Sequence, residues 1–347
     1  TMDAKVIFDL GAIESDGTGA STEETSFAYS YTMNLNTSFT GDDNLYIRLK
    51  TGNHGGWMKD KMDGYLSSLG KNSGTIAVDK IWYEFPVGES NTFWVGPKIE
   101  NYYMHGTAPS IYKPITKQFA LGGNGNAYGA STDTGAGWAY KADNGFAISS
   151  NIGTKSHTTQ KDAAGDYIES GLLSNESKTS FATQIGYTQP QFSVSGIVNL
   201  KYNGWTDGYF HTKTADDKLG SGNFTAYGLR AWWRPLETGS ATPSVSFGYD
   251  TTQHDGVASG SPDSSDMWFA GLTWQDIFQA DDKIGLAFGQ PTTLEDEANE
   301  PFAYELYYSY AVNDAVTVTP TLFGGTDRDG TAGYDLTGAL VQTTFKF

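Results

Sequence analysis

Apolar and polar residues alternate with a period of two along most of this chain, the pattern of β-strands that turn one face toward an apolar environment. Residues 26–39 show it most clearly, because aromatic and aliphatic side chains there alternate with Ala, Ser, Thr and Asn. The same pattern predicts about 16 strands in the whole chain, an even number typical of bacterial membrane barrels. These strands lie near residues 4–13, 26–39, 44–51, 75–86, 92–101, 135–142, 146–154, 178–188, 191–202, 223–234, 243–252, 266–275, 283–290, 302–312, 315–324 and 334–347.

The connections between the predicted strands are alternately short and long. The short ones are 41–43, 87–91, 143–145, 189–190, 236–242, 277–282 and 313–314, and the long ones include 52–74, 102–134, 155–177, 203–222 and 253–265. Outer-membrane barrels have short periplasmic turns and long extracellular loops, and a tilted strand crosses the hydrocarbon with about 9 to 11 residues. The sequence therefore predicts an all-β chain, a single domain over residues 1–347 that forms a 16-stranded antiparallel transmembrane β-barrel.

Aromatic residues support this prediction independently of the strand count. Residues of the apolar parity that lie close to the short turns include Phe39, Phe85, Phe93, Tyr140, Phe146, Tyr187, Phe192, Trp233, Tyr310 and Phe347. Such a row is typical of the aromatic girdle at a membrane interface. A soluble β-sandwich also alternates its core aromatics, but it has no reason to collect them at one end of every strand. We expect the last strand, which ends on Phe347, to close the barrel against the strand near 4–13.

Composition and charge exclude several other classes of protein. The mean hydropathy is -0.42, and no apolar run approaches the roughly 18 residues of a membrane helix. A barrel is compatible with this value, because each strand shows only alternate residues to lipid. The formal net charge of -18 argues against nucleic acid as a partner. The chain has no cysteine, which suits a protein that crosses an oxidising compartment.

Several short motifs resemble those of cyanobacterial outer-membrane porins, which are related to the carbohydrate-selective porins. The motifs are LNTSFTGDDNL (35–45) followed by RLKTGN (48–53), YEFPVG (83–88), FWVG (93–96), GAGWAY (135–140) and VTP (318–320). The resemblance implies a 16-stranded homotrimer in the cell outer membrane that passes small solutes and inorganic ions, with sugar and iron uptake both proposed. Members usually carry an N-terminal S-layer-homology segment, which we expect here to have been removed or replaced by another anchor.

Strand parity assigns a set of charged residues to the lumen of the barrel. The basic members are Arg48, Lys50, Lys80, Lys98 and Arg230, and the acidic members are Glu84, Glu100, Asp250 and Glu305. Charges that face lipid would each cost a few kcal/mol, roughly 2 to 4 at mid-membrane. In a water-filled lumen they can set ion preference, as rings of charge do in other pores. The alternative is that they only form cross-strand pairs.

The longest loop, about 102–134, is the third long loop of the chain. By resemblance to general porins, this loop folds into the lumen and narrows it. We therefore expect its Lys113 and Lys117 to lie at the constriction and to face the basic residues of the wall. The channel should then prefer anions weakly or discriminate little between anions and cations. Its glycines within 122–125 lack the spacing of a phosphate-binding loop, and we expect them to let the chain turn back against the wall. The alternative is a solvated outer loop.

Enzymatic and metal-binding motifs are weak in this sequence. The histidines fall in five different long loops, none with a partner at metal-ligand spacing, and we expect them at the surface: His54, His105, His157, His211 and His254. The segment 327–330 (DRDG) lacks the downstream glutamate of a calcium loop and is expected to be a turn. The acidic residues of the outer loops either bridge lipopolysaccharide through bound divalent cations or only keep these loops soluble.

We predict a porin without cofactor or catalytic residues; the alternative is a secreted carbohydrate-binding β-sandwich or solenoid.

Overall fold

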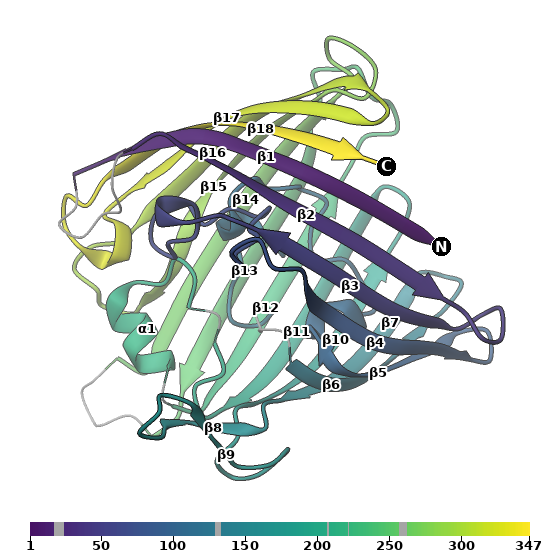
Figure 1. Ribbon diagram of the computed structural model, residues 1–347, viewed down its shortest axis with the longest axis vertical. Helices are drawn as coiled ribbons and strands as arrows, with labels where there is room; N and C mark the ends of the chain where they lie inside the picture. The colour runs from purple at the N-terminus through teal and green to yellow at the C-terminus, as the bar shows by residue number, and fades with distance from the viewer. Residues whose placement is uncertain (17–23, 129–132, 207, 221, 257–261) are drawn as a thin grey trace.

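A computed structural model describes residues 1–16, 24–128, 133–206, 208–220, 222–256 and 262–347. Over these residues the main sheet is a closed barrel of sixteen antiparallel strands, which confirms the predicted fold (Figure 1). The strands are β1 (Met2–Ser15), β2 (Ser26–Thr37), β3 (Asn44–Gly52), β4 (Ala77–Val87), β5 (Asn91–Ile99), β6 (Asp133–Lys141), β7 (Phe146–Thr154), β10 (Thr179–Thr188), β11 (Phe192–Tyr202), β12 (Phe224–Trp233), β13 (Ser244–His254), β14 (Ser264–Gln275), β15 (Lys283–Leu294), β16 (Phe302–Asn313), β17 (Val316–Thr326) and β18 (Leu336–Lys346). The closed ring overturns the sandwich and solenoid alternative.

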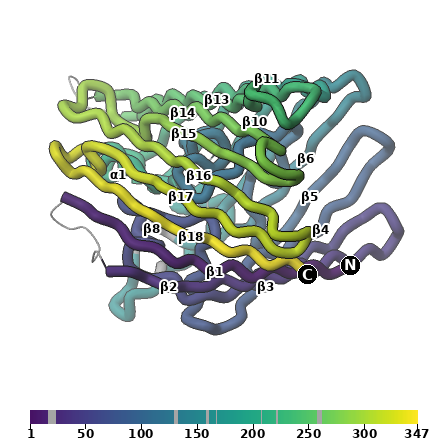
Figure 2. Tube along the Cα trace, turned by 90° about the horizontal axis from the view of Figure 1, so that it is seen from above, coloured from purple at the N-terminus to yellow at the C-terminus, as the bar shows by residue number. Residues whose placement is uncertain are grey.

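The ring closes where β1 pairs with β18. Hydrogen bonds of 2.8 and 3.0 Å join the backbone groups of Ala4 and Phe347 at the end of this seam. Both termini lie side by side at the end of the barrel that carries the short turns (Figure 2). Closure matters because hydrocarbon offers no partner for an unpaired backbone N–H or C=O group. The described segments contain no helix long and apolar enough to cross a membrane.

The two faces of each strand differ in chemistry, as β11 illustrates. Phe192, Val194 and Val198 point outward and are exposed, whereas Ser193 and Asn199 point inward and are buried. The same alternation recurs around the barrel, and the exposed large side chains on the outside are mostly apolar. This outer surface suits lipid, and the polar inner positions suit a lumen that contains protein loops and water.

Shorter elements lie in the long connections. They are the 3-10 helices η1 (Gly56–Met58), η2 (Asn101–Met104), η3 (Lys117–Phe119) and η4 (Arg328–Gly330), the helix α1 (Lys213–Leu219), and a hairpin of β8 (His157–Lys161) and β9 (Tyr167–Glu169). We call residues 53–76 the second loop, 100–132 the third loop, 203–223 the fifth loop and 327–335 the eighth loop. Parts of three predicted loops lie outside the described residues, namely 129–132, 207, 221 and 257–261.

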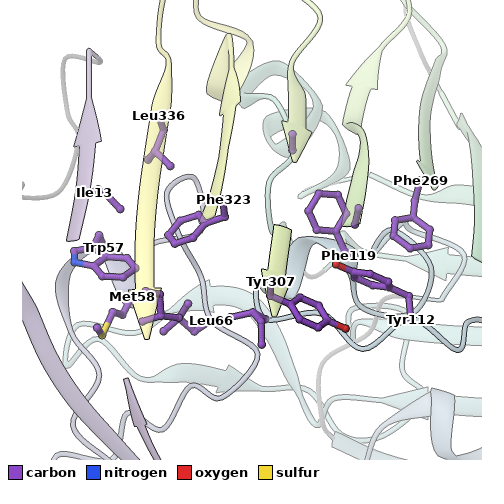
Figure 3. Close-up of a cluster of buried hydrophobic side chains, with 14 of the residues drawn as sticks. Ile13, Trp57, Met58, Leu66, Tyr112, Phe119, Phe269, Tyr307, Phe323 and Leu336 are labelled. Atoms are coloured by element: carbon purple, nitrogen blue, oxygen red, sulfur yellow. The ribbon is translucent and has the colours of Figure 1, made fainter. Parts of the chain in front are cut away.

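An apolar cluster lies inside the barrel, between the loops and one stretch of the wall (Figure 3). The second loop contributes Trp57, Met58 and Leu66, the third loop contributes Tyr112, Ile115 and Phe119, and strands β14 and β16–β18 contribute Phe269, Tyr307, Phe323 and Leu336. The rings of Trp57 and Phe323, for example, stack with centroids 5.8 Å apart. Burying each such side chain contributes about 1.5 to 3 kcal/mol, so both loops are held against this wall. Open space is left on the other side of the loops, toward β1–β4.

Candidate functional site

Glu305 of β16 holds the third loop inside the barrel. Its buried carboxylate accepts hydrogen bonds from the Tyr112 hydroxyl at 2.9 Å and from the Ile115 backbone N–H at 3.0 Å. It also accepts from the backbone N–H and the hydroxyl of Thr116, at 2.6 and 2.8 Å. Two backbone groups of the loop therefore find their partner on the barrel wall, which fixes residues 112–116 against β16 inside the barrel.

A second anchor holds the far arm of the third loop. Arg230 of β12 forms a buried ion pair with Asp250 of β13, and its Nε donates to the Leu121 carbonyl at 2.9 Å. The guanidinium lies 4.5 Å from the centre of the Tyr128 ring. Asp250 in turn accepts a hydrogen bond from the Ala127 N–H at 2.9 Å. Charge-assisted hydrogen bonds of this kind are roughly twice as strong as neutral ones, so this arm is firmly attached.

Two glycines allow the third loop to approach the wall this closely. Gly122 has φ of +74°, a left-handed conformation that favours glycine. A Cβ atom on Gly248 of β13 would lie only 2.0 Å from the Gly122 carbonyl oxygen. The loop backbone therefore packs directly on the wall backbone.

The second loop pairs with the third loop to form one partition across the lumen. The Ser67 N–H donates to the Ile115 carbonyl at 2.8 Å, and the Lys117 N–H donates to the Tyr65 carbonyl at 2.7 Å. The buried carboxylate of Asp9 on β1 anchors the base of the second loop, because it accepts hydrogen bonds of 2.8 Å from His54 Nε2 and of 2.7 Å from the Ser68 hydroxyl. The partition thus spans from β1 to the strands on the opposite side of the barrel.

Arg328 of the eighth loop fastens this partition from the long-loop side. Its Nε and Nη2 donate to the Met62 carbonyl at 2.9 and 2.6 Å, and Nη1 donates to Gln118 Oε1 at 2.9 Å. The Tyr334 hydroxyl adds a 2.7 Å hydrogen bond to Asp63. Burial lowers the pKa of Arg328 to about 10, so the guanidinium still carries its charge at neutral pH. One side chain therefore joins the second, third and eighth loops.

Between the partition and the β1–β4 wall lies a cavity of about 350 Å³, which we call the basic cavity. Its charged lining consists of Lys5, Arg48, Lys50, Lys71, Lys80, Lys117, Asp79 and Glu100. Tyr65, Tyr102 and Tyr209 also contribute to its surface. Strand register explains the clustering, because Arg48 is directly opposite Lys80 and directly opposite residues share a face of the sheet.

Only part of this basic charge is neutralised. Arg48 Nε lies 2.6 Å from Asp79, and Lys80 forms an ion pair with Glu100. Burial alone would raise the pKa of Glu100, but the neighbouring Lys80 and Lys117 lower it to about 2. Lys5, Lys50 and Lys117 form no ion pair with any carboxylate among the described residues. The cavity therefore carries an excess of positive charge.

Aromatic rings position Lys80 beside the cavity. Tyr46, Trp82, Tyr103 and Tyr102 lie in a continuous stack, with centroids 4.1, 4.6 and 4.7 Å apart. The ammonium group of Lys80 lies 5.1 Å from the centre of the Tyr103 ring. A cation–π contact of this kind contributes about 0.5 to 2 kcal/mol. Because the rings cover one another, the stack acts as a wall that fixes the cation.

The structure separates the residues that sequence parity had grouped together. It brings five of them into the basic cavity: Arg48, Lys50, Lys80, Glu100 and Lys117. Arg230 and Glu305 point inward but are fully buried under the third loop, so they anchor it and do not line open space. Lys113 lies away from Lys117, in other cavities toward the short turns, so the prediction that the two lysines share one constriction is wrong.

The prediction that Lys98 faces the lumen is also wrong. Lys98 is exposed and lies directly opposite Ile81, a residue of the outward parity, and its Nζ donates to the Val78 carbonyl at 2.7 Å. The register of β5 against β6 shifts between Gly96 and Ile99. A β-bulge of one residue reverses the alternation beyond it, which turns Lys98 outward.

Among the charged residues of this region, sequence reasoning missed Lys5, Lys71, Asp79 and Arg328. Lys5 lies on the inner parity of β1, so the alternation itself carried the signal. Asp79 lies at a register shift between β3 and β4, which a period-two pattern does not reveal. Arg328 lies in the short 327–330 segment, and nothing in that segment indicates contacts with loops more than 200 residues earlier.

The expectation of surface histidines is wrong for four of the five. Those four are buried: His54, His105, His211 and His254. Burial lowers the pKa of His105 and of His211 to about 3, so both imidazoles are neutral at physiological pH. No group of three or more His, Cys, Asp or Glu side chains is placed to hold a metal ion in the part of the chain that the structure describes.

Comparisons with known proteins agree with this architecture. The family described as "Carbohydrate-selective porin, OprB family" matches residues 4–347. An uncharacterized protein of Nostoc sp. is 25% identical over 355 residues; the alignment covers 91% of this chain, which spans only 60% of the relative's length. Among solved structures, Pseudomonas putida OprB has a TM-score of 0.63 at 11% identity, covering 100% of this chain and 94% of that one. A mutant of the Rh. blastica porin has a TM-score of 0.58 at 10% identity, with 100% and 99% covered. At these identities the solved structures show the fold alone.

Proposed function

Because this chain belongs to the carbohydrate-selective porin, OprB family, we propose that it lets small hydrophilic solutes, sugars and inorganic ions among them, diffuse passively through the outer membrane. The chain forms an outer-membrane porin barrel, and this family and fold are those of channels and not of enzymes. The route we propose runs from the long loops, through the basic cavity, to the short-turn end of the barrel. The mechanism is sieving by the width of the passage, combined with the field of the charges that line it.

The observation that carries the proposal is the basic cavity itself. The apolar cluster fixes both inward loops on one side of the lumen, and the space that remains is lined by cationic and hydroxyl-bearing side chains. Sugar hydroxyls both donate and accept hydrogen bonds, so ammonium, carboxylate and tyrosine groups can replace part of their hydration shell. No chemical step and no energy input is needed.

We further propose that the channel prefers anions weakly. The protein carries a net charge of -18, and acidic outer loops attract cations to the mouth. That effect acts through bulk water and is screened beyond about 10 Å at 0.1 M salt. The unpaired lysines act inside a narrow space with low-dielectric walls, where fields are stronger. The excess of positive charge in the basic cavity should therefore decide the selectivity.

The test is to reconstitute the purified chain in planar bilayers and to measure the reversal potential in a salt gradient. We expect a weak anion preference that Lys117→Glu shifts toward cations. Lys213→Glu, the same change on the exposed surface of the fifth loop, is the matched control and should leave the reversal potential unchanged. A strongly cation-selective wild type, or an unchanged Lys117→Glu channel, would contradict an ion path through the basic cavity. Liposomes without monosaccharide-driven swelling would contradict sugar passage.

Other parts of the prediction rest on the resemblance to cyanobacterial porins and stay proposals. They are a homotrimeric assembly, a cyanobacterial source, contact of the acidic loops with lipopolysaccharide, and iron as a transported ion. The match to a Nostoc protein supports the proposed source. Light scattering of the detergent-solubilised protein measures the assembly directly, and a monomer mass would contradict the trimer.

A further inference from the structure

Two more cavities lie on the short-turn side of the third loop. The larger, of about 520 Å³, includes the β16–β17 turn residues Asn313 and Asp314 in its lining, and the smaller, of about 470 Å³, includes the β12–β13 turn. Both are lined by Lys113 of the third loop and by Lys283 of β15. These cavities therefore lie at the periplasmic end of the barrel, directly below the partition.

Positive charge again predominates in both cavities. Lys346 of β18 joins Lys113 and Lys283 in the larger cavity, against Asp281 and Asp314. Arg234 joins the two shared lysines in the smaller one, against Glu237. None of the three lysines makes an ion pair with a carboxylate in the described ranges. The larger cavity also has a hydroxyl-rich and amide-rich wall, formed by Ser309, Thr317, Thr319, Gln342 and Thr344.

The strand register connects these lysines to the basic cavity. Lys346 is directly opposite Lys5 across the β1–β18 seam, and Lys5 lines the basic cavity. On the same side of the barrel, Lys5 is opposite Thr32, which is opposite Lys50. Directly opposite residues have Cβ atoms about 4.5 to 5.5 Å apart, and like charges at that spacing repel each other. An anion beside Lys5 and Lys346 would relieve this repulsion, so the seam offers a path past the partition.

We propose that Lys113, Lys283 and Lys346 form a second solute site, which binds the acidic group of an anionic sugar after it leaves the basic cavity. The acidic group is a carboxylate or a phosphate, and the surrounding hydroxyl and amide side chains contact the sugar hydroxyls. This inference rests on the proposed function, because it assumes that solute reaches the periplasmic end. Two sites of moderate affinity in series favour conduction, because a solute must bind tightly enough to enter the channel and weakly enough to leave it.

The experiment uses the full chain with gluconate, glucose 6-phosphate and glucose as probes. Titration calorimetry of the detergent-solubilised protein measures binding without requiring conduction. In bilayers, each probe is added separately to the two sides, and block of the chloride current is recorded. The variants are Lys113→Gln and Lys283→Gln, and Lys141→Gln is the matched control. Lys141 is an exposed lysine at the short-turn end of β6 that lines neither cavity.

We expect gluconate or glucose 6-phosphate, but not glucose, to bind, and each variant to weaken binding by about threefold, as removal of one partly screened charge does. Block from the periplasmic side should weaken in parallel, with Lys141→Gln unchanged. Binding of only one anionic probe would identify a carboxylate or a phosphate site. Equal affinity in wild type and both variants would overturn the inference. Channels that do not conduct, although the probe binds and the variants weaken it, would contradict the proposed function and leave the site intact.

Discussion

Replacing Glu305 by alanine tests whether one buried carboxylate holds the third loop across the lumen. The substitution removes the acceptor of four hydrogen bonds, two of them from the backbone N–H groups of Ile115 and Thr116. A buried donor left without a partner costs about 1 to 3 kcal/mol, so the two N–H groups alone cost roughly 2 to 6 kcal/mol. This cost falls on the docked loop and not on the barrel, because the backbone pairing of β16 with β15 and β17 does not involve the side chain.

We therefore expect residues 112–117 to leave the wall in Glu305→Ala, while the far arm stays attached through Arg230 and Asp250. Lys117 would then move out of the basic cavity. Single-channel recordings should show a larger and noisier conductance together with a reduced anion preference. Heat-modifiable migration on a denaturing gel should stay as in wild type, since the barrel itself is intact.

Glu84→Ala is the matched control for this experiment. Glu84 is an inward carboxylate of β4 that accepts a 2.6 Å hydrogen bond from Trp94 Nε1 of β5. The Glu84→Ala variant should lose some stability without a change in conductance, because neither Glu84 nor Trp94 belongs to the third loop. Wild-type conductance and reversal potential in Glu305→Ala would refute the reasoning, since they would mean that the apolar contacts alone keep the loop in place.

Three further predictions concern the loops, the membrane face and pH. Arg328→Ala should weaken the attachment of the second loop by roughly 2 to 4 kcal/mol, seen as faster tryptic cleavage in that loop; cleavage at the wild-type rate would contradict this. Leu35→Arg should destabilise the barrel more in urea unfolding than Asn34→Arg does, because only the outward arginine faces the lipid side, at a cost that would reach roughly 2 to 4 kcal/mol at mid-membrane; equal effects would contradict the assigned faces. Because its pKa is lowered from 4.5 to about 2, Glu100 contributes stability through its pair with Lys80 above pH 4.5 and loses it as pH falls toward 2. Because the folded channel protonates Glu100 only near its lowered pKa of about 2, anion preference should stay constant from neutral pH to about 3 and rise as the pH approaches 2, a rise that Glu100→Gln should abolish.

Local pattern was enough to determine the barrel. Each strand has lipid on one face and the lumen on the other, so apolar and polar residues alternate with a period of two within every strand. In β11, for example, the outward residues are Phe192, Val194 and Val198, and the inward ones include Ser193 and Asn199. The alternation of short and long connections then fixes which end is periplasmic. The inner position of Arg48, Lys50 and Lys80 follows from the same parity, because a charge costs much less in the lumen than in lipid.

Only the tertiary structure decided what the inward charges do. A bulge adds one residue without a signal in the sequence, and that single step turned Lys98 outward. Parity could not tell Glu305 and Arg230, which anchor a loop, from Lys50, which lines open space, because all three point inward. The difference depends on the path of the long loops, and that path is set by contacts between residues far apart in the chain, such as those of Arg328 with the second loop. Such contacts have no periodicity, so the site is decided by which side chains the folded loops cover and which they leave facing water.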